Sequence, residues 1–134
     1  MLSDTIIAFC NALRDPLALT DTLGRVAMIN PALRDLLVLG PEENVPRQLF
    51  QLMPAHRRRD QEAQLQACLR GEHILSATSE LETRNGRRVP VRLTLSLFHQ
   101  NPDADPLVVW SFKQNKDIVP PPLDRLNLIL KDEI

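Results

Sequence analysis

Residues 20–37, TDTLGRVAMINPALRDLL, constrain the fold of this chain more than any other stretch. They read as a Leu-Gly-Arg turn, an alternating strand over residues 25–29, and a helix that begins at Pro31. Asn30 is a strong helix N-cap, because its side-chain oxygen accepts a hydrogen bond from an unpaired backbone N–H. Pro31 suits the first helical position, where its missing N–H costs nothing. The segment therefore predicts a hairpin that runs directly into a short helix.

Composition excludes several classes of protein. The chain has 134 residues and predicts one domain with a single core. Its net charge of −1 and pI near 6.3 argue against a nucleic-acid-binding module. No run approaches the roughly 18 apolar residues of a membrane span, and the N-terminus lacks the features of a secretory signal. Cys10 and Cys68 form neither a disulfide framework nor a zinc spacing. We expect a cytoplasmic protein that contacts neither nucleic acid nor membrane.

The N-terminal residues predict an amphipathic helix over residues 4–14. Its apolar residues recur at helical spacing. Ile6, Cys10 and Leu13 form the stripe, which Ile7 and Phe9 broaden. An isolated helix of this length is marginal in water, so it must dock on its own sheet or on a partner. We expect a homodimer with this helix at the interface, through Ile6, Ile7, Cys10 and Leu13.

The remaining elements give an α+β pattern. Strands are expected at 17–20, 25–29, 74–83, 89–97 and 107–112. Helices are expected at 31–39 and 55–70, with short helical turns around 42–44 and 47–52. Asn85-Gly86 lies between two strand-like runs and is a strong hairpin signal. All the helices beyond the N-terminal one fall between two groups of strands, so no alternation supports a parallel sheet.

With these elements placed, the chain resembles a PAS domain, the small sensor module of signalling proteins. Three segments carry the resemblance: DTLGRVAMINPAL, the helix MPAHRR…LRGE, and the hairpin ETRNGRRVPVRLTLS. The resemblance implies a five-stranded antiparallel sheet with helices packed over one face and a small-molecule pocket between them. It divides the chain into an N-terminal helix (1–15), a PAS sensor domain (16–115), and a proline-rich linker with the start of a signalling helix (116–134).

The departures from the family pattern bear on cofactors and coupling. Many members end the last strand with Asp-Ile-Thr, whereas residues 116–119 here are Lys-Asp-Ile-Val, which leaves the usual coupling to an effector in doubt. The reactive-cysteine motif of flavin-binding members has no counterpart. Haem-binding members carry a histidine within the long helix, at a register that falls near Asp60 here, and His56 lies at the first turn instead. We therefore expect no cofactor, neither haem nor flavin.

Candidate pocket residues follow from the resemblance. We expect an apolar pocket to draw on Met28, Leu36, Leu37, Phe50, Met53, Leu65, Leu69, Leu95 and Trp110. The same positions suit ordinary core packing, and their large side chains leave little room. This favours a second reading, a ligand-free docking or dimerisation domain with a filled core. Arg57, Arg58 and Arg59 are interpreted as a solvated helix face rather than an anion site.

Nothing in the sequence indicates catalysis. The chain has no glycine-rich phosphate loop, no nucleophile with a suitably spaced histidine, and no paired carboxylates in a loop. The leading interpretation is a non-catalytic PAS sensory and dimerisation module of a bacterial-type regulator. It would pass a ligand- or packing-dependent change to a C-terminal effector domain or partner protein.

Overall fold

The last strand in the described part of the chain lies in the middle of the sheet. The computed structural model describes residues 2–71 and 74–114. Its five strands are ordered β2-β1-β5-β4-β3, and every neighbouring pair is antiparallel. The strands are β1 (Leu17–Thr20), β2 (Val26–Ile29), β3 (Ile74–Glu82), β4 (Arg88–Phe98) and β5 (Leu107–Gln114). The predicted α+β class and antiparallel sheet are confirmed.

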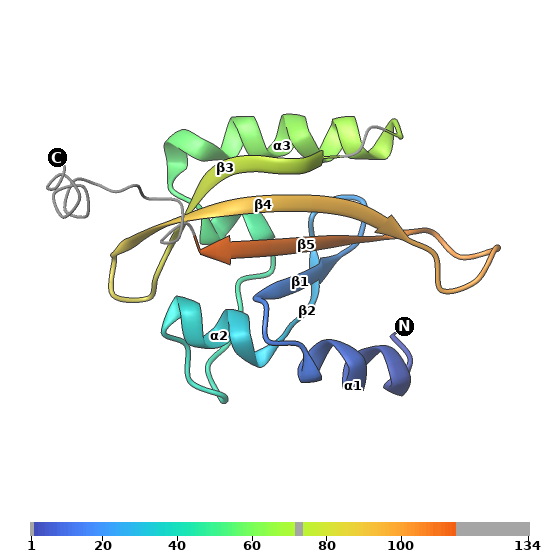
Figure 1. Cartoon of the computed structure of the whole chain (residues 1–134), viewed down its shortest axis with the longest axis horizontal. Helices are drawn as coiled ribbons and strands as arrows, with labels where there is room; N and C mark the ends of the chain where they lie inside the picture. Colours follow the sequence, from blue (N-terminus) through green and yellow to red (C-terminus); the bar gives the residue numbers. More distant parts are fainter. Residues whose placement is uncertain (1, 72–73, 115–134) are drawn as a thin grey trace, which may run out of the picture.

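The helices divide between the two faces of this sheet (Figure 1). One face packs against α2 (Pro31–Leu37), the short 3-10 helix η1 (Leu49–Leu52) and α3 (Ala55–Leu69). The other face carries α1 (Asp4–Ala12) over β1 and β2. This division follows the alternation of strand side chains, because successive residues of a strand point to opposite faces. None of the helices in the described part of the chain is long and apolar enough to cross a membrane.

The main core lies beneath α2, η1 and α3. Along β4, Val89, Val91, Leu93 and Leu95 are buried, and each alternates with a more exposed residue. Trp110 and Phe112 on β5 share the same buried face. The predicted period-two strand is therefore confirmed, and it supplies one wall of the core.

The element boundaries agree with those predicted from the sequence to within two residues, with one exception. The helical turn expected at 42–44 is not helical; instead the Glu43 N–H donates to the Gly40 carbonyl in a single turn. The Arg34 guanidinium donates to the carbonyls of Gly40 and Glu43, at 2.8 and 3.0 Å. The loop is therefore held by the Arg34 side chain and not by the backbone hydrogen bonds of a helix. The expected linker and helix at 116–134 lie outside the described residues.

Asn30 joins three elements through one buried side chain. Its Oδ1 accepts from the Leu33 N–H, which caps α2, and from the Leu17 N–H at the start of β1. Its Nδ2 donates to the carbonyls of Cys10 and Asp15, at 3.1 and 2.9 Å. Asn30 is fully buried, so three of these bonds are shielded from water, and the bond to Asp15 is partly shielded.

Asn30→Asp is expected to lower the free energy of unfolding by about 3 kcal/mol, because it keeps the acceptor but removes both donors and buries a charge beside two carbonyl oxygens. Urea unfolding measures the change. Ser3→Asp is the matched control, since Ser3 caps the exposed start of α1, where Asp serves equally well. Equal effects of the two substitutions would contradict the role assigned to the Nδ2 donors.

Candidate ligand-binding core

The structure brings together eight of the nine residues predicted to line a pocket. Each belongs to the main core or packs against it, between the helices and the sheet. Five are almost fully buried, namely Leu37, Met53, Leu65, Leu95 and Trp110. Leu36, Phe50 and Leu69 are partly buried at its margin. Whether any of them contacts a ligand stays a prediction.

Trp110 lies at the centre of this core. Its indole meets the ring of Phe50 edge to face, with 5.9 Å between ring centroids and planes at 85°. Its neighbours across the sheet are Ala18 on β1 and Leu95 on β4. The indole Nε1–H donates to the Thr20 hydroxyl at 2.9 Å, which satisfies the one polar atom of the ring. The orientation of Trp110 is therefore set by both packing and a hydrogen bond.

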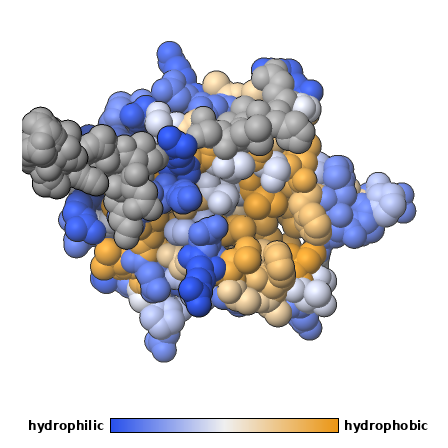
Figure 2. All heavy atoms as spheres, in the orientation of Figure 1, coloured by the Kyte–Doolittle hydropathy of each residue, from blue (hydrophilic) through white to orange (hydrophobic). Residues whose placement is uncertain are grey.

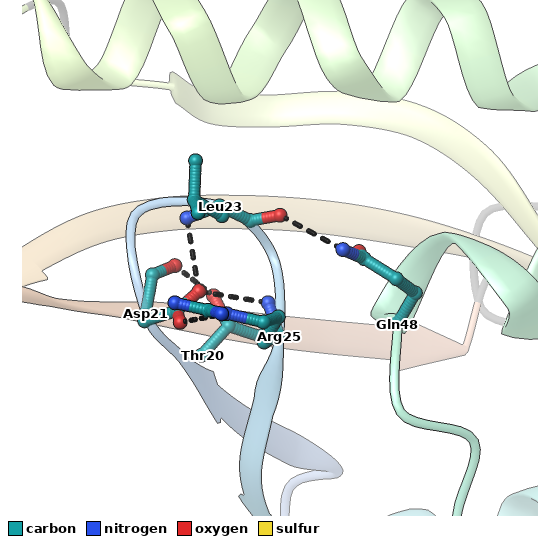
Figure 3. Close-up of polar contacts among 5 residues, drawn as sticks. All are labelled: Thr20, Asp21, Leu23, Arg25 and Gln48. Carbon is teal, nitrogen blue, oxygen red and sulfur yellow. Dashed lines mark hydrogen bonds and ion pairs between the residues drawn. The ribbon is translucent and has the colours of Figure 1, made fainter.

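Thr20 connects this indole to the turn between β1 and β2. Figure 3 shows the polar contacts of that turn. The Thr20 hydroxyl donates to the Asp21 carbonyl at 2.9 Å. Asp21 Oδ1 accepts from the N–H groups of Leu23 and Arg25, and its Oδ2 pairs with Arg25 Nε at 2.6 Å. Gln48, which precedes η1, donates to the Leu23 carbonyl at 3.2 Å. The turn is thus linked to both the core tryptophan and the helical layer.

The hydrogen bonds of this turn also control the ionisation of Asp21. Burial acts to raise the pKa of the carboxyl group. The hydrogen bonds from Arg25 and Leu23 and the charge of Arg25 outweigh that effect and hold the pKa below its ordinary value. The folded protein therefore favours the charged form of Asp21.

Met28 lies apart from the other predicted pocket residues. It packs with α1 on the opposite face of the sheet, close to Leu17 and Leu19. It also lines a shallow surface hollow of about 490 Å³, together with Ile7 and Asn11 of α1 and Arg34 of α2. A strand as short as β2 offers no extended alternation that shows which of its residues faces which layer.

The residues predicted for a dimer interface are used mainly within the chain. Cys10 is buried against Leu17 and Leu19, and Ile6 and Leu13 pack beside it. Ile7 lines the hollow next to β2. Phe9, in contrast, leaves 65% of its surface exposed. Most of the stripe thus packs on the chain's own sheet, and its role in a dimer interface stays a prediction.

Gln61 is a buried polar residue that sequence reasoning missed. It lies on α3 with no exposed surface, and neither its Oε1 nor its Nε2 has a hydrogen-bond partner. Ser79 on β3 is 3% exposed, and its hydroxyl is also unpaired. The burial of Gln61 could have been predicted, because Gln61 precedes Leu65 and Cys68 at helical spacing and so belongs to the buried stripe of α3. The charged residues around Gln61 obscured this spacing.

The arginine run at the start of α3 is only partly solvated. Arg57 Nε lies 3.6 Å from Glu80 Oε1, and His56 Nε2 lies 3.1 Å from the same atom. Arg58 Nε donates to the carbonyls of Phe50 and Met53, at 3.1 Å each. The predicted solvated face is therefore wrong for Arg57, which is half-buried against Glu80, whereas Arg58 is exposed although it binds two carbonyls. Arg59 is exposed as expected.

Groups that bind metals or react as nucleophiles do not gather in this core. Across residues 2–71 and 74–114, no three His, Cys, Asp or Glu side chains lie close enough together to hold a metal ion. Cys10 and Cys68 are both free and buried, and burial raises the pKa of each thiol. A raised pKa leaves little thiolate, the reactive form of cysteine.

Comparison with known proteins identifies the fold. A family model described as PAS fold matches residues 10–110. A PAS domain of an HTR-like protein from Haloarcula marismortui is 17% identical with a TM-score of 0.66, over 82% of this chain and 88% of that one. A domain of a sensory box sensor histidine kinase/response regulator from Geobacter sulfurreducens is 19% identical with a TM-score of 0.64, over 83% and 92%.

A further solved structure extends the comparison. The Rhodobacter sphaeroides LOV protein is 17% identical with a TM-score of 0.70, over 84% of this chain and 66% of that one. These low identities establish similarity of fold alone. No curated protein gives a significant match to the sequence.

Thr20→Val is expected to lower the free energy of unfolding by about 2 kcal/mol, because it leaves the indole N–H of Trp110 buried without an acceptor. Urea unfolding followed by Trp110 fluorescence measures the loss. Thr20→Ser keeps the hydroxyl and serves as the control. If the Val variant is as stable as the Ser variant, the hydrogen bond contributes nothing.

Asp21→Asn is expected to lower stability near neutral pH but not in strong acid. Because the pKa of Asp21 is lowered on folding, its contribution is present above the unfolded value of about 3.9 and is lost as the pH falls through the folded pKa. The difference is small, since the Asp21 side chain is 37% exposed and its pairing is screened. Thermal unfolding across pH 2–7 measures it, with Asp105→Asn in an exposed loop as control. A pH-independent difference would contradict the assignment.

Proposed function

The chain belongs to the PAS fold family, and on that premise we propose that it is a sensory and dimerisation module with no catalytic activity of its own. The observation that carries this proposal is the position of Trp110, fully buried between the helices and the central strand of the sheet. A small molecule bound in that core would press on β5, which contacts β1 on one side and β4 on the other. The domain from the Geobacter sensor kinase is a precedent for a similar fold in a signalling protein.

The proposed signal leaves through β5. This strand carries Trp110 and Phe112 and ends at Gln114, where the chain continues toward its C-terminal segment. A bound molecule biases such a module only if it binds one packing arrangement more tightly than another. We place an effector domain or partner protein at the receiving end, in the cytoplasm, with an organic ligand in preference to haem or flavin.

An apolar surface beside α1 supports the proposed dimer. Phe9 of α1 leaves 65% of its surface exposed, and Ile7 of the same helix lines a hollow that Leu107 of β5 also lines. Leu107 in turn faces Phe98 of the neighbouring strand β4, and Phe98 is 38% exposed. Figure 2 shows hydrophobic side chains gathered over one area of the surface. We name Phe9, Phe98 and Leu107 the apolar surface.

A second function has its own support. Leu37, Met53, Leu65 and Leu95 occupy the positions at which a ligand would lie, and each is at most 2% exposed. A core so completely filled favours a docking or dimerisation domain that needs no ligand. The two functions share the dimer and differ in whether the core opens to a small molecule.

Native mass spectrometry of the protein purified without added ligand separates these functions. We expect a dimer that carries extra mass from a retained small molecule. A dimer without extra mass favours the ligand-free docking domain. A monomer at high concentration contradicts the dimer proposal.

Phe9→Ser is expected to convert the dimer to a monomer while leaving the circular dichroism spectrum unchanged, because Phe9 is exposed and supports no core. Loss of one large aromatic anchor typically costs an interface about 2 kcal/mol or more. Leu23→Ser is the matched control, since Leu23 is 61% exposed at the β1–β2 turn, outside the apolar surface. Dissociation by both variants, or by neither, would overturn the assignment of the surface.

A further inference from the structure

We propose that Gln61 and Ser79 recognise a small neutral molecule that presents an N–H donor beside a carbonyl acceptor, as a lactam or carboxamide does. The site is the interface between α3 and β3. This inference rests on the proposed sensory function and names the chemical class of its ligand. It gives a role to polar atoms that packing alone leaves unexplained.

The first observation is the unpaired amide of Gln61. A buried amide without partners carries the full cost of its desolvation. Native proteins therefore satisfy such groups, or retain them for a bound molecule. The amide offers both a carbonyl acceptor and an N–H donor, so it matches a ligand edge that carries the complementary pair. Exposed positions on the same helix, such as Gln66, impose no such cost.

The second observation is the unpaired hydroxyl of Ser79, which the fold brings to the same interface. β3 runs back along α3 in the opposite direction (Figure 1). Arg57 lies one turn before Gln61 and pairs with Glu80, the residue after Ser79. This ion pair aligns the turn that carries Gln61 with the Ser79 region of β3. The side chains of this interface are also small, with Ala77 on β3 and Cys68 on α3 packed against the main core.

The third observation is that no fully buried side chain in the described part of the chain is charged. Among the described residues, the buried polar side chains are Thr20, Asn30, Gln61, Ser79 and Thr83, and none is ionisable in the ordinary pH range. Arg57 and Glu80 at the edge of the site pair with each other, so an ionised ligand would enter this core without a free counter-charge, at a large desolvation cost. The remaining wall is apolar, with Leu65 on the same face of α3 and Leu93 on β4. The site therefore selects a neutral molecule with an apolar body.

Two probes that differ by one hydrogen-bond donor test this chemistry. 2-Pyridone carries adjacent N–H and C=O groups, whereas N-methyl-2-pyridone keeps the ring and the carbonyl but lacks the donor. The side-chain amide signal of Gln61 is followed by ¹H–¹⁵N NMR and assigned by its loss in Gln61→Met. We expect 2-pyridone to shift this signal and N-methyl-2-pyridone to leave it unchanged. Equal shifts with both probes, or with neither, overturn the proposed recognition.

Variants test the cost of the unpaired polar atoms of Gln61 and Ser79. Gln61→Met keeps the length of the side chain and removes the polar atoms, so it is expected to raise the melting temperature of ligand-free protein by about 5 °C. Ser79→Ala is expected to raise it by less. Gln66→Met is the matched control, an exposed glutamine of the same helix, and should change nothing. A lower melting temperature for Gln61→Met means that buried water or another group satisfies the amide, and it overturns the proposal.

Native mass spectrometry of the same variants separates this inference from the proposed function. Extra mass retained by wild type and lost by Gln61→Met supports both. Extra mass retained by both proteins leaves ligand sensing intact and overturns the role of Gln61. No extra mass in either protein, together with no response to 2-pyridone, overturns the recognition site and favours the ligand-free docking domain.

Discussion

The Asn30 side chain is the constraint on which the arrangement of the N-terminal half depends. Its oxygen caps the start of α2 and binds the backbone N–H at the beginning of β1. Its nitrogen donates to the carbonyl of Cys10 in the last turn of α1 and to the carbonyl of Asp15, which follows that helix. A cap alone would place α2 after β2 and nothing more. Because the same amide also binds Cys10 and Asp15, it determines how the chain crosses from α1 on one face of the sheet to the helical layer on the other. Four hydrogen bonds from one buried group make this crossing specific, since no other side chain offers two donors and an acceptor at that size.

The second requirement is the closure of β1 on β5, which joins the two ends of the domain. β1 and β2 form one hairpin, and β3, β4 and β5 form a meander, so the sheet becomes continuous only where β1 pairs with β5. Closing so long a segment costs conformational entropy that local contacts do not offset. Trp110 stabilises this junction, because it lies on β5, packs on Phe50 and donates to Thr20 on β1. The residue at the centre of the proposed sensory core therefore also holds the sheet together, and a molecule that moved it would affect both halves.

The two faces of the sheet suit different parts of the proposed function. The face under α2, η1 and α3 is closed, apolar and interrupted by the unpaired polar atoms of Gln61 and Ser79. The face under α1 is only partly covered, which leaves Phe9 and the Phe98–Leu107 pair at the surface. β5 contributes to both faces, since Trp110 and Phe112 point one way while Leu107 and Val109 point the other. Ligand binding and dimerisation, as proposed, would thus share one strand.

The local elements were predictable from the sequence alone, because their signals lie within a few residues of one another. Asn30-Pro31 marks the start of α2, Asn85-Gly86 marks a hairpin, and the alternation from Val89 to Leu97 marks a half-buried strand. The sequence also brought eight of nine pocket candidates into one core. Only the tertiary structure placed Met28 on the other face, turned most of the α1 stripe onto its own sheet, gave Arg58 two backbone acceptors, and left Gln61 unpaired. Those outcomes depend on which distant groups meet across the sheet, and partners that are far apart in the chain leave no periodic signal along it.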